Sequence, residues 1–146
     1  MGLDELYREI ILNHYRAPHH FKKIEGPTAF ARKENSVCGD RIEVMICVDG
    51  EGRLQEVAFQ GAACAICTAS ASIMCDLLQG KTLAQAQDIL QEFMRIMLGE
   101  QPAQGLSSLG DAKSLEGVLP YPSRTHCALV AWQAMEECTK TALERS

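Results

Sequence analysis

A β-hairpin pattern between residues 41 and 60 is the feature that most constrains what this chain can fold into. β-Branched apolar residues occupy every second position from 42 to 48, which is typical of a strand with one buried face. The sequence Asp49-Gly50-Glu51-Gly52 favours a turn, and residues 54–60 form the returning strand. Gly61 is expected to end this second strand. The segment therefore predicts two antiparallel strands joined by a short loop.

Helical patterns flank the hairpin on both sides. Apolar residues recur at spacings of three and four between Leu3 and His14, and Pro18 ends this first helix because proline disfavours helical geometry in the preceding residue. Residues 17–37 are expected to be a long irregular stretch, and residues 100–123 short pieces broken by glycine and proline. Further helices are expected over residues 64–79, 82–98 and 123–143. This order of elements predicts an α+β fold, a small antiparallel β-sheet covered by helices.

The length and charge of the chain limit the classes of function. A chain of 146 residues is long enough for one compact domain, expected to span residues 1–146. With 19 acidic and 14 basic residues the net charge is −5, which argues against the basic surface that nucleic-acid binding needs. No apolar run reaches the roughly 18 residues of a membrane span, and the acidic start Met1-Gly2-Leu3-Asp4-Glu5 is unlike a secretory signal. We therefore expect a cytoplasmic protein with no nucleic-acid or membrane partner.

Seven cysteines are the unusual part of the composition. Their odd number excludes a fully paired disulfide framework, and cytosolic thiols are kept reduced, so metal binding, reactive thiol chemistry and core packing remain. Candidate ligands lie where predicted elements begin: Cys38 with Asp40, Cys64, and Cys127. Three thiolates and one carboxylate suit tetrahedral zinc, and thiolates also bind iron–sulfur clusters. The long intervals leave open whether these side chains meet, and Cys38-Gly39-Asp40 alone also fits a turn aspartate beside a buried cysteine.

The remaining cysteines and the histidines each allow more than one interpretation. Cys67 forms a C-x-x-C with Cys64, so a thiol–disulfide oxidoreductase is an alternative function, while Cys67 also fits a fourth ligand or a packed residue. His126 precedes Cys127 and is the histidine best placed for chemistry, although an exposed histidine without a role fits as well. The other histidines are expected to pack on the first helix (His14) or to lie in the loop (His19 and His20). Buried structural cysteines are expected at Cys47, Cys75 and Cys138.

Three motifs occur in order along the chain. They are Cys38-Gly39-Asp40, the run from Gly61-Ala62-Ala63-Cys64 to Met74, and Arg124-Thr125-His126-Cys127-Ala128-Leu129-Val130-Ala131-Trp132. With the opening segment Leu6-Tyr7-Arg8-Glu9-Ile10-Ile11-Leu12-Asn13-His14-Tyr15, they resemble the U-type iron–sulfur cluster assembly proteins of the IscU/NifU-like family. The similarity covers nearly the whole chain. The long interval between the second and third motifs resembles the SufU branch of that family.

The resemblance implies an α+β fold, a cofactor and a partner. It implies one metal ion, usually Zn²⁺, bound by Cys38, Asp40, Cys64 and Cys127. It also implies a pyridoxal-phosphate-dependent cysteine desulfurase of the SufS kind, from whose persulfide the protein accepts sulfur and passes it toward cluster-accepting proteins. Scaffold-type relatives instead assemble a [2Fe–2S] cluster on the equivalent ligands.

The residues expected to accept sulfur depend on the branch. Cys38 is the leading acceptor in a SufU-type sulfurtransferase and Cys127 in a scaffold, with Arg124 and His126 positioning the persulfide or binding metal. Cys67 falls where relatives commonly carry another residue. His126 matches the scaffold branch, whereas SufU proteins often carry lysine there.

Overall fold

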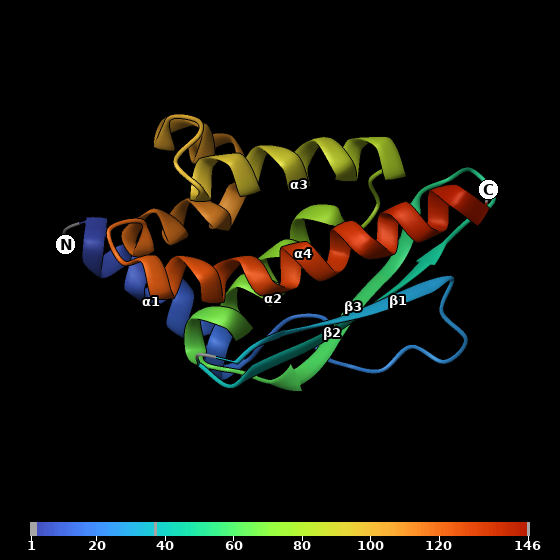
Figure 1. The fold of residues 1–146 in the computed structure, drawn as a ribbon, viewed down its shortest axis with the longest axis horizontal. Coiled ribbons are helices and arrows are strands. Elements are labelled where there is room, and N and C mark those ends of the chain that lie inside the picture. Colours follow the sequence, from blue (N-terminus) through green and yellow to red (C-terminus); the bar gives the residue numbers. More distant parts are fainter. Residues whose placement is uncertain (1–2, 37, 146) are drawn as a thin grey trace.

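The computed structural model describes residues 3–36 and 38–145 (Figure 1), so Met1, Gly2, Val37 and Ser146 of the expected domain lie outside the described residues. The elements follow in the order α1 (Leu3–Arg16), β1 (Ala29–Asn35), β2 (Asp40–Val48), β3 (Leu54–Ala62), α2 (Ala65–Leu78), α3 (Leu83–Met97), the 3-10 helices η1 (Ala103–Ser108) and η2 (Gly110–Val118), and α4 (Pro122–Arg145). A small antiparallel sheet with helices confirms the predicted α+β class.

The sheet has three strands in the order β1-β2-β3, and both neighbouring pairs are antiparallel. The predicted hairpin is confirmed as β2 and β3. The expectation of an irregular stretch over residues 17–37 is wrong for residues 29–35, which form β1. The buried positions at the start of this strand hold Ala29 and Ala31, and such small side chains give the sequence little hydrophobic alternation.

Gly61 lies inside β3, whereas the sequence predicted that it would end the strand. It pairs with Ile42 at a φ of 149°, and a Cβ atom there would collide with the carbonyl oxygen of Arg41. Glycine tolerates this backbone conformation and close approach, so the ladder continues. β3 therefore runs on to Ala62 and brings the chain to Cys64 at the start of α2.

The long C-terminal helix α4 lies against the sheet, in contact with β1 and β2, and also packs on α2 and α3 (Figure 1). Trp132 of α4 is buried, and its ring stacks on Phe93 of α3 with the centroids 3.7 Å apart. Its Nε1 donates a hydrogen bond to Ser70 Oγ of α2 at 2.8 Å. Three helices thus meet at one aromatic side chain. A smaller apolar cluster contains Ile24, Met45 and Ala58.

The helix boundaries follow local signals. Thr82 and Gln85 form a capping box at the start of α3, in which each side chain accepts a hydrogen bond from the other residue's amide at 3.1 and 3.0 Å. The punctuated stretch after Gly99 forms η1 and η2. Within the described ranges, none of the helices is both long and apolar enough to cross a membrane.

Candidate metal centre

One end of the sheet gathers the candidate ligands from three places in the chain. Cys38 lies in the turn between β1 and β2, and Asp40 is the first residue of β2. Cys64 is the N-cap of α2, directly after β3. Cys127 lies in the second turn of α4, the helix that packs on β1 and β2. The antiparallel register explains the convergence, since Asn35 pairs with Asp40 at the same end where β3 passes into α2.

The ligand atoms lie at distances that suit a metal ion. One atom each from Cys38, Asp40 and Cys127 lie within 4.8 Å of one another. The sulfurs of Cys38 and Cys127 are 3.3 Å apart, and Cys64 Sγ lies 3.8 Å from Asp40 Oδ2. Zinc–sulfur bonds of about 2.3 Å place the sulfurs of a tetrahedral site about 3.8 Å apart. The side chains therefore fit a Cys₃Asp set, with Cys64 joined to the closer group through Asp40.

Asp40 is the buried charge of this centre, with only 1% of its surface exposed. Its Oδ1 accepts a hydrogen bond from the Cys64 amide at 2.8 Å, and its Oδ2 faces the Cys64 thiol. A buried carboxylate is costly unless hydrogen bonds and a cation compensate for the lost hydration. The donor set of three soft sulfurs and one oxygen matches zinc, and thiolates equally suit iron.

Cys127 shows how the environment controls the thiols. Burial raises the pKa of the Cys127 thiol, and hydrogen bonds among this thiol, Cys38, Asp40 and Cys64 raise it further. The protonated thiol is therefore the stable form when no cation is bound. A divalent cation reverses this preference, because a coordinating thiol is deprotonated. Metal binding and thiolate formation are coupled at this residue.

Cys67 lies in the first turn of α2, next to the thiol centre. It is fully buried, and its amide hydrogen points to Cys64 Sγ, with nitrogen and sulfur 3.4 Å apart. Burial raises the pKa of the Cys67 thiol, and the nearby Asp40 raises it further. All seven cysteines are free thiols, so Cys64 and Cys67 do not form a disulfide here.

Arg124 and His126 lie on the exposed side of α4. The Arg124 guanidinium lies 4.8 Å from the centre of the Tyr121 ring. The His126 side chain lines a cavity of about 430 Å³ together with Asn35, whose Nδ2 donates to Cys127 Sγ at 3.7 Å. Asn35 thus connects this cavity to the thiol centre. The sequence analysis did not select Asn35, because its register opposite Asp40 becomes visible only when β1 is known.

Comparison with known proteins decides the family. The profile of the NifU-like N-terminal domain matches residues 6–140. The chain belongs to this NifU-like family. The iron–sulfur cluster assembly scaffold protein IscU of Streptococcus pyogenes serotype M1 is 36% identical over 139 residues, covering 94% of this chain and 85% of that protein. The zinc-dependent sulfurtransferase SufU of Bacillus subtilis is 34% identical over 136 residues, covering 93% and 90%.

A solved structure supports the same NifU-like assignment. The crystal structure of a putative iron–sulfur cluster assembly scaffold protein for the SUF system from Fervidobacterium islandicum superposes with a TM-score of 0.80. It is 27% identical and covers 94% of this chain and 99% of that one. The resemblance seen in the sequence motifs is confirmed, and so is the fold that it implied.

Proposed function

We propose that this NifU-like chain is a zinc-bound sulfur acceptor that works with a cysteine desulfurase in iron–sulfur cluster biogenesis. The observation that carries the proposal is the meeting of three thiols and one carboxylate at the end of the sheet. The Bacillus subtilis relative named as a zinc-dependent sulfurtransferase supports it. Zn²⁺ held by Cys38, Asp40, Cys64 and Cys127 would keep the thiols deprotonated at neutral pH.

Cys38 is the sulfur acceptor in this proposal. It is exposed, whereas Cys127 is 3% exposed and Cys64 is half-buried. The Cys38 thiolate attacks the outer sulfur of the partner's persulfide. The new sulfur–sulfur bond forms on Cys38 as the old one breaks, and the partner's cysteine leaves as a thiolate. The exchange needs no added oxidant or reductant, because one persulfide replaces another.

The residues around Cys38 would position the incoming persulfide. Asp40, a hard oxygen ligand, binds zinc less tightly than a thiolate and so favours ligand exchange. His126 and Arg124 stand on the exposed side of α4, where a partner's chain would enter. Asn35 donates a hydrogen bond to Cys127 Sγ and would keep that sulfur in place.

The partner in this proposal is a pyridoxal-phosphate-dependent cysteine desulfurase of the SufS kind, and the final recipients are cluster-accepting proteins. An IscU-type scaffold that assembles a [2Fe–2S] cluster is the second candidate. The name of the Streptococcus relative favours it, as does the ability of the same thiolates to hold iron. Anaerobic reconstitution with iron and sulfide separates the two functions. A cluster that transfers to an acceptor supports the scaffold, and zinc that resists replacement supports the sulfur acceptor.

The decisive experiment measures metal content and desulfurase activation on the same sample. Cys64→Ser and Cys127→Ser are each expected to bind one ion fewer than the wild type and to lose stimulation of the desulfurase. Cys38→Ser is expected to lose sulfur acceptance, seen as the absence of a persulfide on the intact protein by mass spectrometry. Cys47→Ser is the matched control, since Cys47 lies on β2 outside the group and is also only partly exposed. Full metal content and full stimulation in Cys64→Ser would refute the ligand set.

A further inference from the structure

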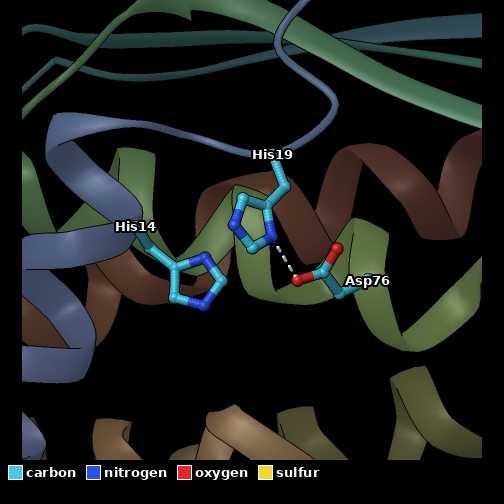
Figure 2. Close-up of side chains that lie close together, drawn as sticks. All are labelled: His14, His19 and Asp76. Carbon is cyan, nitrogen blue, oxygen red and sulfur yellow. Dashed lines mark hydrogen bonds and ion pairs between the residues drawn. The ribbon is translucent and has the colours of Figure 1, made fainter.

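A second group of metal-ligating side chains lies away from the thiol centre. His14 comes from α1, His19 from the loop that follows, and Asp76 from α2 (Figure 2). One nitrogen from each ring and one Asp76 oxygen all lie within 4.8 Å of one another. Asp76 follows Cys64 by twelve residues along α2, which separates the two groups by about 18 Å. The histidine group is therefore distinct from the site described above.

The buried histidine of this group is held in one tautomer. His14 is 4% exposed, and its Nε2 lies 2.9 Å from Asp111 Oδ2 of η2. Because an ionised carboxylate can only accept, this nitrogen carries the proton of the neutral ring. Nδ1 lies 2.7 Å from Ser72 Oγ, which also accepts a hydrogen bond from the His19 amide. Nδ1 therefore accepts the hydrogen of the Ser72 hydroxyl, and an ion bound at Nδ1 would displace this hydrogen bond. A carboxylate behind the imidazole is the usual arrangement of a metal-bound histidine.

The two consecutive histidines of the loop both turn toward Asp76. His19 Nδ1 lies 2.6 Å from Asp76 Oδ2, and His20 Nε2 lies 2.9 Å from Oδ1. His20 has a φ of 64°, which is uncommon for a residue with a side chain. This backbone conformation brings neighbouring side chains to one carboxylate. His19 and Asp76 are exposed, so an ion from solvent can reach them.

We propose that His14, His19 and Asp76 bind a second divalent transition-metal ion, with Asp111 orienting His14. With neutral histidines, the carboxylates of Asp76 and Asp111 balance the charge of the ion. Imidazole ligands select zinc, cobalt or nickel over magnesium and calcium, which prefer oxygen. Bound metal would tie α1 and its following loop to α2.

To accept such an ion, the exposed side chains must shift and the Ser72 hydroxyl must turn away from His14 Nδ1. Zinc–nitrogen and zinc–oxygen bonds of about 2.1 Å place neighbouring ligand atoms of a tetrahedral site about 3.4 Å apart. His19 Nδ1 and Asp76 Oδ2 are 2.6 Å apart, so these exposed side chains separate by less than about 1 Å. The ion takes the place of the proton on His19 Nδ1, which is released to solvent.

Titration of the metal-free full chain with cobalt(II) tests the second site. Thiolate ligands give an intense sulfur-to-cobalt charge-transfer band, whereas a site of nitrogen and oxygen ligands lacks it. Equilibrium dialysis counts the ions while the band reports the thiol centre separately. We expect two cobalt ions per wild-type chain. The ion at the histidine group adds nothing to the charge-transfer band. The proposal is overturned if the number of cobalt ions counted by dialysis equals the number of thiolate-bound ions given by the band. This outcome is independent of how much cobalt the thiol centre binds.

Variants of the exposed ligands keep the test independent of folding. His19→Ala and Asp76→Asn are expected to bind one ion fewer, with the charge-transfer band unchanged. Asp111→Asn alters only the residue that orients His14. It is expected to lower the affinity for the second ion about 10- to 100-fold. Asp88→Asn on α3 is the matched control, an exposed helical aspartate outside the group. Equal counts and affinities in Asp76→Asn, His19→Ala and Asp88→Asn would refute the assignment.

Discussion

The amide and the thiol of Cys64 both face the carboxylate of Asp40, with the nitrogen 2.8 Å from Oδ1 and the sulfur 3.8 Å from Oδ2. Cys64 caps α2 and Asp40 begins β2, so this pair joins the helix to the strand. It also presents one sulfur and one oxygen side by side. The spacing of these two candidate ligands therefore depends on the main chain that precedes Cys64.

Gly61→Ala is expected to disturb that main chain. The added Cβ would collide with the carbonyl oxygen of Arg41, and the backbone conformation there is unfavourable for alanine. We expect a loss of about 1–3 kcal/mol in the free energy of unfolding, together with weaker metal binding. Urea denaturation and metal content measure the two effects. Gly117→Ala is the control, because a Cβ there meets no atom within 4 Å. Equal behaviour of the two variants would contradict the prediction.

Alkylation of the metal-free native protein should separate the cysteines by exposure and pKa. Burial raises the pKa of Cys138 to about 12, with a further contribution from Glu137, and burial likewise raises the pKa of Cys75. Alkylating reagents react with the thiolate, so both residues should stay unmodified from pH 7 to 9 while the exposed Cys38 reacts. Peptide mass spectrometry identifies the modified sites. Modification of Cys75 as fast as Cys38 would show that the predicted protection is absent.

Metal removal is expected to loosen the fold. Ions that bind only the native state stabilise it, and structural zinc contributes on the order of 10 kcal/mol in small peptides. Loss of even a few kcal/mol would lower the Tm of a chain this long by on the order of 10 °C. Calorimetry with and without a chelator measures the change. Cys64→Ser should respond less than wild type or Cys47→Ser, and an unchanged wild-type Tm would exclude a stabilising metal.

A substitution of Phe93 tests how much its packing on Trp132 of α4 contributes to stability. Its stacked contact with Trp132 is buried, so Phe93→Ala is expected to cost about 3–5 kcal/mol of unfolding free energy. Phe30→Ala should change stability by less than about 0.5 kcal/mol, because Phe30 is 64% exposed. Denaturant titration of both variants gives the comparison. A similar loss in both would mean that the stacked ring carries little of the stability.

Elements with local signals could be predicted from the sequence. The capping box at Thr82 and the buried alternate positions Ile42, Val44 and Ile46 depend on neighbouring residues, and both appear in the structure. The alternation is incomplete, because Val48 is only half-buried and Met45 is buried in the smaller cluster with Ile24. β1 could not be predicted, because its pairing with β2 is a tertiary contact and its buried residues Ala29 and Ala31 are small. The continuation of β3 through Gly61 likewise depends on the neighbouring strand.

The two groups of candidate ligands differ in how visible they are in the sequence. Cys38 and Asp40 were selected with the other cysteines from their place at element starts and from the family motifs, without knowledge of their distances. The sequence analysis expected His14 to pack on its own helix, yet it bonds to Ser72 and Asp111, which lie 58 and 97 residues away. Contacts at such separations leave no periodic pattern in the chain.

The unbroken length of α4 connects distant parts of the fold. Cys127 lies near its beginning, while Cys138 Sγ points to the Val44 carbonyl oxygen at 3.4 Å and Arg145 donates to the Thr28 carbonyl at 2.9 Å. A helix of 24 residues is about 36 Å long. Cys127 therefore belongs to one continuous helix whose other end is bonded to the residue that precedes β1. A substitution that interrupts α4 between these points would separate the Cys127 thiol from the contacts that anchor the helix on the sheet.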